Sequence, residues 1–160
     1  MYVDYSSISD EAKVWVYPSS RKFYTTEIEE LEQSIKEFVE NWKNDDENFK
    51  ASYQLLYNRF IVLVADDSTS ALINSDIDTS VSFILTLQEK YNIALLDKMN
   101  VCFKQGEYVQ YKELKDFKKL LKSKAVTGKT IIFDNLISNN YDFKNFWETP
   151  IEESWYNRFL

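Results

Sequence analysis

The chain contains no histidine at all. Ser-His-Asp and Cys-His catalysis in their usual forms need an imidazole, so this absence excludes both, together with metal sites built on histidine. Cysteine is nearly absent too: Cys102 stands alone, so no internal disulfide can form. Because Cys102 lies between Val101 and Phe103, we interpret it as a small buried side chain and not as a nucleophile.

Glycine and proline are also scarce, with two of each among 160 residues. The glycine-rich phosphate loops are therefore excluded: neither Gly-x-x-x-x-Gly-Lys-Ser/Thr nor Gly-x-Gly-x-x-Gly occurs, and Gly128-Lys129-Thr130 lacks the first glycine of the former. Flexible linkers are equally unsupported. Since composition does not shift along the chain, residues 1–160 are predicted to form a single α+β domain.

Positive charge is in short supply, and the formal net charge is −7. This balance speaks against nucleic-acid binding, and the lysines within 112–124 are interpreted as the solvated face of a helix. No stretch reaches the roughly 18–20 apolar residues of a membrane span, so no membrane insertion is expected. The first residues lack the charged and apolar regions of a signal peptide, which favours a soluble, cytoplasmic protein.

The chain is rich in apolar residues, which make up 44% of it, and in aromatic residues, which make up 16%. These residues recur with the periods of strands and helices. Alternation and apolar runs predict strands at 12–17, 50–57, 60–65, 99–104, 107–111 and 130–134. Helical spacing predicts helices at 26–43, 75–91 and 113–124, with a polar loop at 44–48. The aromatic tail at 143–159 is expected to pack back on the body.

The predicted order is β-α-β-β-α-β-β-α-β, which indicates the α+β class. We expect one mixed or antiparallel sheet with helices on one face. The first six elements match the order of a ferredoxin-like split β-α-β unit, and the remaining elements would extend that sheet or form a related arrangement.

Arginine is the scarcest charged residue, with three against sixteen lysines. The string Tyr57-Asn58-Arg59-Phe60 recurs as Tyr156-Asn157-Arg158-Phe159, and Arg21 also lies among aromatic residues. Guanidinium groups bind phosphate and carboxylate with a planar fork that lysine lacks. We therefore predict that Arg21, Arg59 and Arg158, with Tyr57 and Trp155, bind an anionic group. The alternative is that each arginine lies over a ring or pairs with a surface glutamate.

Aspartates gather where a predicted strand ends and the next helix begins. Asp66 follows the strand, and Asp76 and Asp78 open the helix. Carboxylates in such places hold Mg²⁺ or Ca²⁺, although the spacing matches no EF-hand. The alternative is that they cap the helix and face its dipole. The sequence thus predicts no cofactor but leaves room for a divalent cation at Asp66, Asp76 and Asp78.

Several segments together carry a resemblance to a known family. They are Ala12-Lys13-Val14-Trp15-Val16-Tyr17 with Arg21, Tyr57-Asn58-Arg59-Phe60, Asp76-Ile77-Asp78-Thr79-Ser80-Val81, Asp97-Lys98-Met99-Asn100-Val101, Phe133-Asp134-Asn135-Leu136 and Ser154-Trp155-Tyr156-Asn157-Arg158-Phe159. Over nearly its whole length the chain resembles a family of small bacterial proteins often labelled "ABC transporter ATPase". The resemblance implies no established activity, and the chain has nothing similar to Walker A, the signature motif or Walker B.

The chain also departs from that family. Relatives have Gly-Cys-Ser-Ile-Asp-Ser-Ser in place of 74–80 and a histidine in place of Tyr156. If that cysteine and histidine act chemically in the relatives, the departure implies that this chain is either a binding protein or a degenerate member of the family.

These observations favour a non-enzymatic binding or interaction module that contacts an anionic group of a small ligand or a protein partner. The alternative is an enzyme that acts on a phosphorylated or carboxylate substrate with carboxylate or metal assistance. A third hypothesis, an ABC-transporter-associated ATPase, conflicts with the missing P-loop. The oligomeric state stays open.

Overall fold

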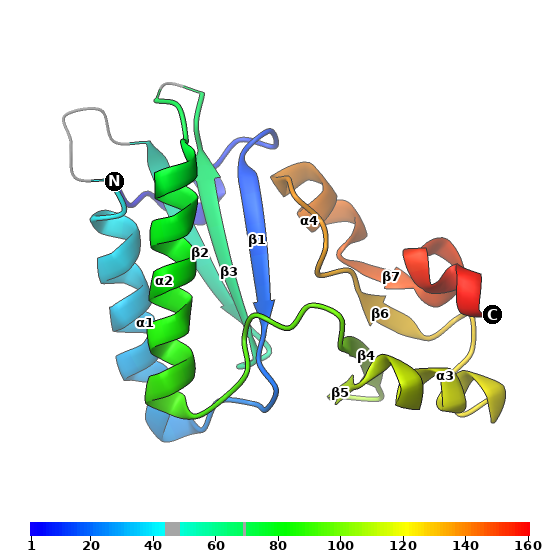
Figure 1. Cartoon of the computed structure of the whole chain (residues 1–160). Helices are drawn as coiled ribbons and strands as arrows, with labels where there is room; N and C mark the ends of the chain where they lie inside the picture. Colours follow the sequence, from blue (N-terminus) through cyan, green and yellow to red (C-terminus); the bar gives the residue numbers. More distant parts are fainter. Residues whose placement is uncertain (44–48, 69) are drawn as a thin grey trace.

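The chain folds into two antiparallel sheets with four α-helices, in a computed structural model that describes residues 1–43, 49–68 and 70–160 (Figure 1). The first sheet has the order β1-β3-β2, from β1 (Lys13–Pro18), β2 (Lys50–Leu56) and β3 (Phe60–Asp66). The second has the order β5-β4-β6-β7, from β4 (Val101–Gln105), β5 (Tyr108–Lys112), β6 (Ile131–Phe133) and β7 (Glu148–Pro150). The helices are α1 (Thr25–Glu40), α2 (Asn74–Tyr91), α3 (Leu114–Lys122) and α4 (Asn140–Phe146). Short 3-10 helices lie at Tyr5–Ser7, Ile151–Glu153 and Trp155–Phe159.

The α+β class and the order of the nine predicted elements are confirmed, with ends that differ by up to three residues. Helix α1, for example, begins at Thr25 because the Glu27 carboxylate accepts a hydrogen bond from the Tyr24 backbone N–H (2.8 Å). Helix α4 and strand β7 were not predicted; β7 lies within the aromatic tail, and α4 overlaps the start of the tail. The loop predicted at 44–48 falls outside the described residues.

The prediction of one extended sheet is wrong. Strands β1, β3 and β2 with helices α1 and α2 do form a split β-α-β arrangement, and both strand pairs are antiparallel. A ferredoxin-like sheet would place β4 beside β1, but β4 pairs with β5 and β6. The edge of β1 is partly covered instead by 138–140: Val14 N–H donates to Ser138 C=O (3.0 Å), and Asn140 N–H donates to Ala12 C=O (2.9 Å).

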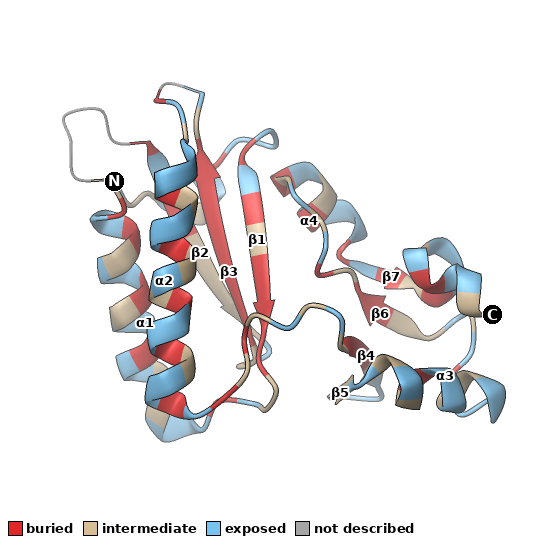
Figure 2. Cartoon of the chain, in the orientation of Figure 1, coloured by how far each residue is buried: buried red, intermediate tan, exposed pale blue. Residues whose placement is uncertain are grey.

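One face of the first sheet is covered by α1 and α2, which lie side by side along it (Figures 1 and 2). The buried stripe of α1 consists of Leu31, Ile35 and Val39, at the four-residue spacing of a helix face. Trp42 continues this stripe and donates its indole N–H to the Asp76 backbone C=O (2.8 Å). The two helices therefore form one continuous core with the sheet.

The other face of the first sheet packs against the second sheet and α4. Phe60, Val62 and Val64 of β3 join Cys102 and Phe133 in this second core. Every residue of β3 is buried as a result, because helices cover one face and a sheet covers the other (Figure 2). The unbroken apolar run at 61–64 is typical of such a central strand.

The second sheet buries its remaining face under α3 and the C-terminal segment. Phe117 of α3 contacts the Tyr156 ring (centroids 5.7 Å apart), and Ile132 and Ile151 complete this third core. The expected packing of the aromatic tail on the body is thus confirmed. Within the described ranges, no helix is both long and apolar enough to cross a membrane.

Candidate anion-binding pocket

Arg21 is fully engaged near the ends of two helices. Its guanidinium donates two hydrogen bonds to the Glu27 carboxylate (2.9 and 3.1 Å) and one to the Tyr91 backbone C=O (2.9 Å). It also lies over the Tyr24 ring, 4.2 Å from the centroid. The hydrogen bond from Arg21 lowers the pKa of Glu27. Arg21 therefore joins the start of α1 to the end of α2.

Arg158 is engaged within its own segment. Its guanidinium stacks on the exposed Trp155 ring, 3.9 Å from the centroid, and its Nε donates to the Trp155 backbone C=O (3.1 Å). Both groups belong to the C-terminal 3-10 helix, on the far side of the second sheet from α1 (Figure 1). This is the ring-stacking alternative that the sequence left open.

Arg59 differs from the other two because it follows a tight turn between β2 and β3. Tyr57 and Asn58 have positive φ angles of 56° and 50°, and Arg59 N–H donates to Leu56 C=O (3.0 Å). These are the features of a type I′ turn with Tyr57 and Asn58 as its central residues. A left-handed tyrosine is uncommon, and it fixes the direction in which the turn leaves β2.

The turn lies beside the segment that links β1 to α1. Phe23 N–H donates to Asn58 C=O (2.7 Å), and Ser19 N–H donates to Arg59 C=O (3.0 Å). These backbone hydrogen bonds hold Lys22 next to the turn. Lys22 lies far from Arg59 in the sequence, so no local sequence pattern identified Lys22 as a candidate site residue.

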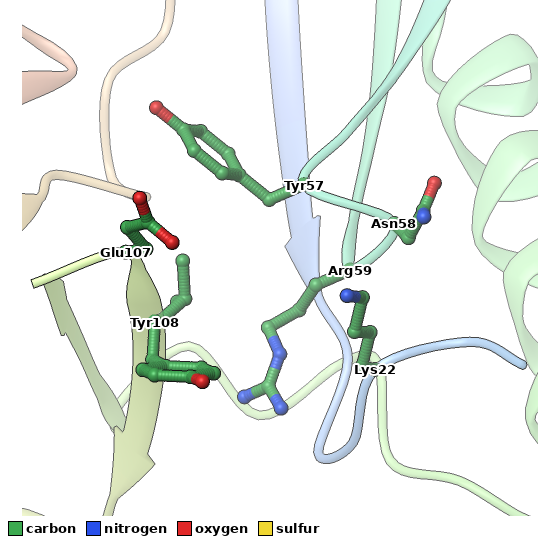
Figure 3. A pocket seen from close by; sticks show the side chains of 7 residues that line it. Lys22, Tyr57, Asn58, Arg59, Glu107 and Tyr108 are labelled. Carbon is green, nitrogen blue, oxygen red and sulfur yellow. The ribbon is translucent and has the colours of Figure 1, made fainter. Parts of the chain in front are cut away.

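A pocket of about 350 Å³ opens between this turn and the β4–β5 hairpin (Figure 3). Its lining residues are Lys22, Tyr57, Asn58, Arg59, Glu107, Tyr108 and Val109. Figure 3 shows the Arg59 guanidinium extended between Lys22 and Tyr108, with Glu107 on the Tyr108 side. Of the five residues predicted for an anion site, Tyr57 and Arg59 line this pocket, whereas Arg21, Trp155 and Arg158 lie elsewhere.

The Arg59 guanidinium is partly withdrawn from water without compensation. Its Nη1 is buried and has no hydrogen-bond partner among the described residues. Burial lowers the pKa of Arg59, because the charged form loses solvation, while nearby Cys102 and Tyr111 oppose the change. A buried polar nitrogen without a partner destabilises a fold. Because the Arg59 side chain also lines the pocket, an anion there would be attracted to a guanidinium charge that is poorly solvated.

The Tyr57 side of the pocket is braced by the second sheet. Tyr57 donates its hydroxyl to the Glu148 carboxylate (2.9 Å), and Lys104 forms an ion pair with the same carboxylate. The Tyr57 ring meets Phe133 edge-on, with centroids 5.3 Å apart. These contacts connect the turn to β4, β6 and β7, so the pocket spans both sheets.

Two of the three predicted cation residues already have partners in the protein, and Asp76 also forms an ion pair with Lys43 (3.8 Å). Asp76 accepts a hydrogen bond from the Ile73 backbone N–H (2.9 Å), as a helix-capping carboxylate does, and Asp66 accepts from the Ser68 N–H (3.1 Å). Asp78 is exposed on α2. Across residues 1–43, 49–68 and 70–160, no three Asp, Glu or Cys side chains are grouped to hold a metal ion.

Cys102 faces the core between the sheets, and burial raises the pKa of its thiol to about 12. We expect it to resist 5,5′-dithiobis(2-nitrobenzoate) at pH 8 in the native protein, and to react completely once urea unfolds the chain. The absorbance at 412 nm measures both rates, with Cys102→Ala as the blank. Rapid labelling without urea would contradict the burial of this thiol.

Four lining residues were missed by the sequence analysis: Lys22, Glu107, Tyr108 and Val109. The strands predicted at 99–104 and 107–111 do correspond to the β4–β5 hairpin that carries Glu107 and Tyr108. Its position opposite the β2–β3 turn depends on the packing of the two sheets, which no local pattern encodes.

Comparison with known proteins gives no match to a protein-family model, a curated protein or a solved structure. The resemblance to a family of small bacterial proteins stays a prediction. The chemistry of the pocket is therefore the guide to function.

Proposed function

We propose that this protein is a binding module whose pocket holds an anionic group of a small ligand or a protein partner, through Arg59 and Lys22. The observation that supports the proposal is the Arg59 guanidinium, which borders the pocket and has a buried Nη1 without a partner among the described residues. Arg21 and Arg158 have partners of their own, so Arg59 is the arginine whose surroundings favour a ligand.

An oxyanion in the pocket would accept charge-assisted hydrogen bonds from Arg59, and the Lys22 ammonium would add attraction. Such bonds are about twice as strong as neutral ones, and a partly dry site strengthens them further. Glu107 opposes a second negative group on its side of the pocket. The site therefore suits a compact anion, either phosphate or carboxylate, with the charge directed toward Arg59.

The exposed Tyr108 ring indicates which chemical group the ligand should carry beyond its anionic end. This side chain is 75% exposed although it borders the pocket. An apolar or aromatic portion of a ligand would cover it and gain from the burial of its surface. The proposed ligand thus combines an anionic end with a less polar remainder.

The alternative of carboxylate- or metal-assisted catalysis has no specific contact in its favour. Asp66 and Asp76 already accept hydrogen bonds from backbone N–H groups, and neither lines the pocket. Binding is the chemistry that the pocket supports best.

The proposal predicts that Arg59→Lys weakens the binding of pyrophosphate, phosphate or citrate by about tenfold or more, which corresponds to one lost charge-assisted hydrogen bond. Isothermal titration calorimetry at low ionic strength measures the affinity. The matched control is Arg158→Lys, which changes the other Tyr-Asn-Arg-Phe string and should leave the affinity unchanged. Equal losses in the two variants, or no binding of any of these anions to the unaltered protein, would refute the proposal.

A further inference from the structure

Strand β5 forms an outer edge of the second sheet, and this edge borders the pocket. β5 pairs with β4 on one side only, and no strand in the described part of the chain pairs with its other side. Its residues are exposed or half-buried along the whole strand. An open edge of this kind offers unpaired backbone groups to an added strand.

The geometry of the hairpin shows which backbone groups point outward. The β4–β5 loop has two residues, Gly106 and Glu107, and Gly106 has a positive φ of 61°, as in a type II′ turn. In such hairpins the residues that flank the loop, Gln105 and Tyr108, form the first hydrogen-bonded pair. Because bonded and non-bonded pairs alternate, Val109 directs its backbone N–H and C=O away from β4.

The same alternation directs the backbone of Tyr111 outward, two residues further along. Val109 also lines the pocket together with Arg59 and Lys22. A row of open hydrogen-bonding groups on β5 thus leads directly into the part of the pocket that carries positive charge. No single anion would use both features.

We propose that the outer edge of β5 binds an extended peptide that pairs antiparallel with it and places its C-terminal carboxylate against Arg59. This inference rests on the proposed function, because it names the partner class of the same pocket. The backbone of the peptide supplies affinity, and the carboxylate fixes its register.

The direction of the peptide follows from charge. β5 runs from Tyr108 to Lys112, and the pocket lies at the Tyr108 end. An antiparallel peptide ends its chain there and brings a carboxylate to Arg59 and Lys22, whereas a parallel peptide would bring its ammonium group to two cations. Antiparallel pairing also continues the pattern of the second sheet.

The two ends of the edge differ in what they offer to the peptide. Lys112, exposed at the far end of β5, favours an acidic residue near the start of the peptide.

The two faces of β5 also differ. Val109 and Tyr111 pack their side chains toward the core between the sheets. The exposed Tyr108 ring lies on the opposite face of the strand, because side chains alternate. An apolar residue close to the C-terminus of the peptide could cover that ring.

The test uses the full chain, immobilised, and an equal mixture of two random hexapeptide pools, one with free C-termini and one amidated. Mass spectrometry measures which peptides are retained. We expect free-carboxylate peptides to be enriched about tenfold over their amides, as the loss of a charge-assisted contact predicts. The key variant is Val109→Pro, which removes an outward N–H but no bond to β4; Val109→Ala is its matched control.

Val109→Pro should lose the enriched peptides, whereas Val109→Ala should retain them. If Val109→Pro does not fold, as circular dichroism shows, the retained peptides are remade with N-methylated backbones and should no longer bind the unaltered protein. Retention of amidated peptides, unchanged binding by Val109→Pro or by N-methylated peptides, or no enrichment at all would overturn the inference. The weakening of pyrophosphate binding by Arg59→Lys tests the proposed function separately.

Discussion

Replacing Phe60 with alanine is expected to lower the free energy of unfolding by about 3–5 kcal/mol, as large-to-small changes of buried aromatic residues do. Phe60 is fully buried between the two sheets. Its ring lies 4.8 Å from Phe133 and 5.0 Å from Trp147, measured between centroids. The substitution would leave a cavity in the contact that joins the sheets. Urea denaturation followed by tryptophan fluorescence measures the change.

The matched control is Phe146→Ala, because Phe146 is 51% exposed at the end of α4. That change should lower the free energy of unfolding by less than about 1 kcal/mol, as surface substitutions do. A similar loss in both variants would contradict the packing of the two sheets through Phe60. A second unfolding transition in Phe60→Ala would indicate that the sheets also unfold separately.

Replacing Arg59 with methionine is expected to change stability and binding in opposite directions. Methionine keeps the aliphatic stem and removes a partly buried charge whose Nη1 has no partner within the described residues. Without a ligand, the free energy of unfolding should rise by about 1 kcal/mol, a value reduced for the partial exposure of the side chain. Binding of pyrophosphate, however, should fall below detection by calorimetry. Thermal unfolding with and without pyrophosphate measures both effects.

Arg21→Met is the control for this second prediction. Arg21 donates hydrogen bonds to Glu27 and to the Tyr91 backbone, so its removal should destabilise the protein by about 1 kcal/mol while pyrophosphate still raises the melting temperature. A binding site that relies on a strained or unsatisfied side chain commonly lowers the stability of the whole fold. If Arg59→Met were instead as destabilising as Arg21→Met, Arg59 would be a structural residue.

Nine elements of this fold were predictable because each carries a local period, whereas α4 and β7 were not. The spacing of Leu31, Ile35 and Val39 encodes α1, and the run at 61–64 encodes a strand buried on both faces. The separation into two sheets was not predictable in this way. It depends on β4 pairing with β6 and not with β1, and on Phe60 packing against Phe133, and both contacts join residues far apart in sequence.

The candidate site shows the same limit. The scarcity of arginine singled out Arg59, which lines the pocket, but the repeated tetrapeptide suggested an equivalence with Arg158 that the fold does not have. Tyr57 and Asn58 adopt left-handed conformations in a hairpin turn, whereas Trp155–Phe159 forms a 3-10 helix. Identical side chains thus point Arg59 into a pocket and Arg158 onto its own neighbour. Tertiary context decided which arginine is available to a ligand.

The most direct measurement of the central claim is a side-chain NMR titration of the arginine Nε–H groups with pyrophosphate. With three arginines in the chain, the spectrum contains three Nε–H signals, and Arg59→Lys and Arg158→Lys assign them. We predict that the Arg59 signal shifts in a saturable way while those of Arg21 and Arg158 stay in place. Saturable shifts of Arg21 or Arg158 alone, or no shift of Arg59 at saturating pyrophosphate, would contradict the assignment of this pocket as an anion site.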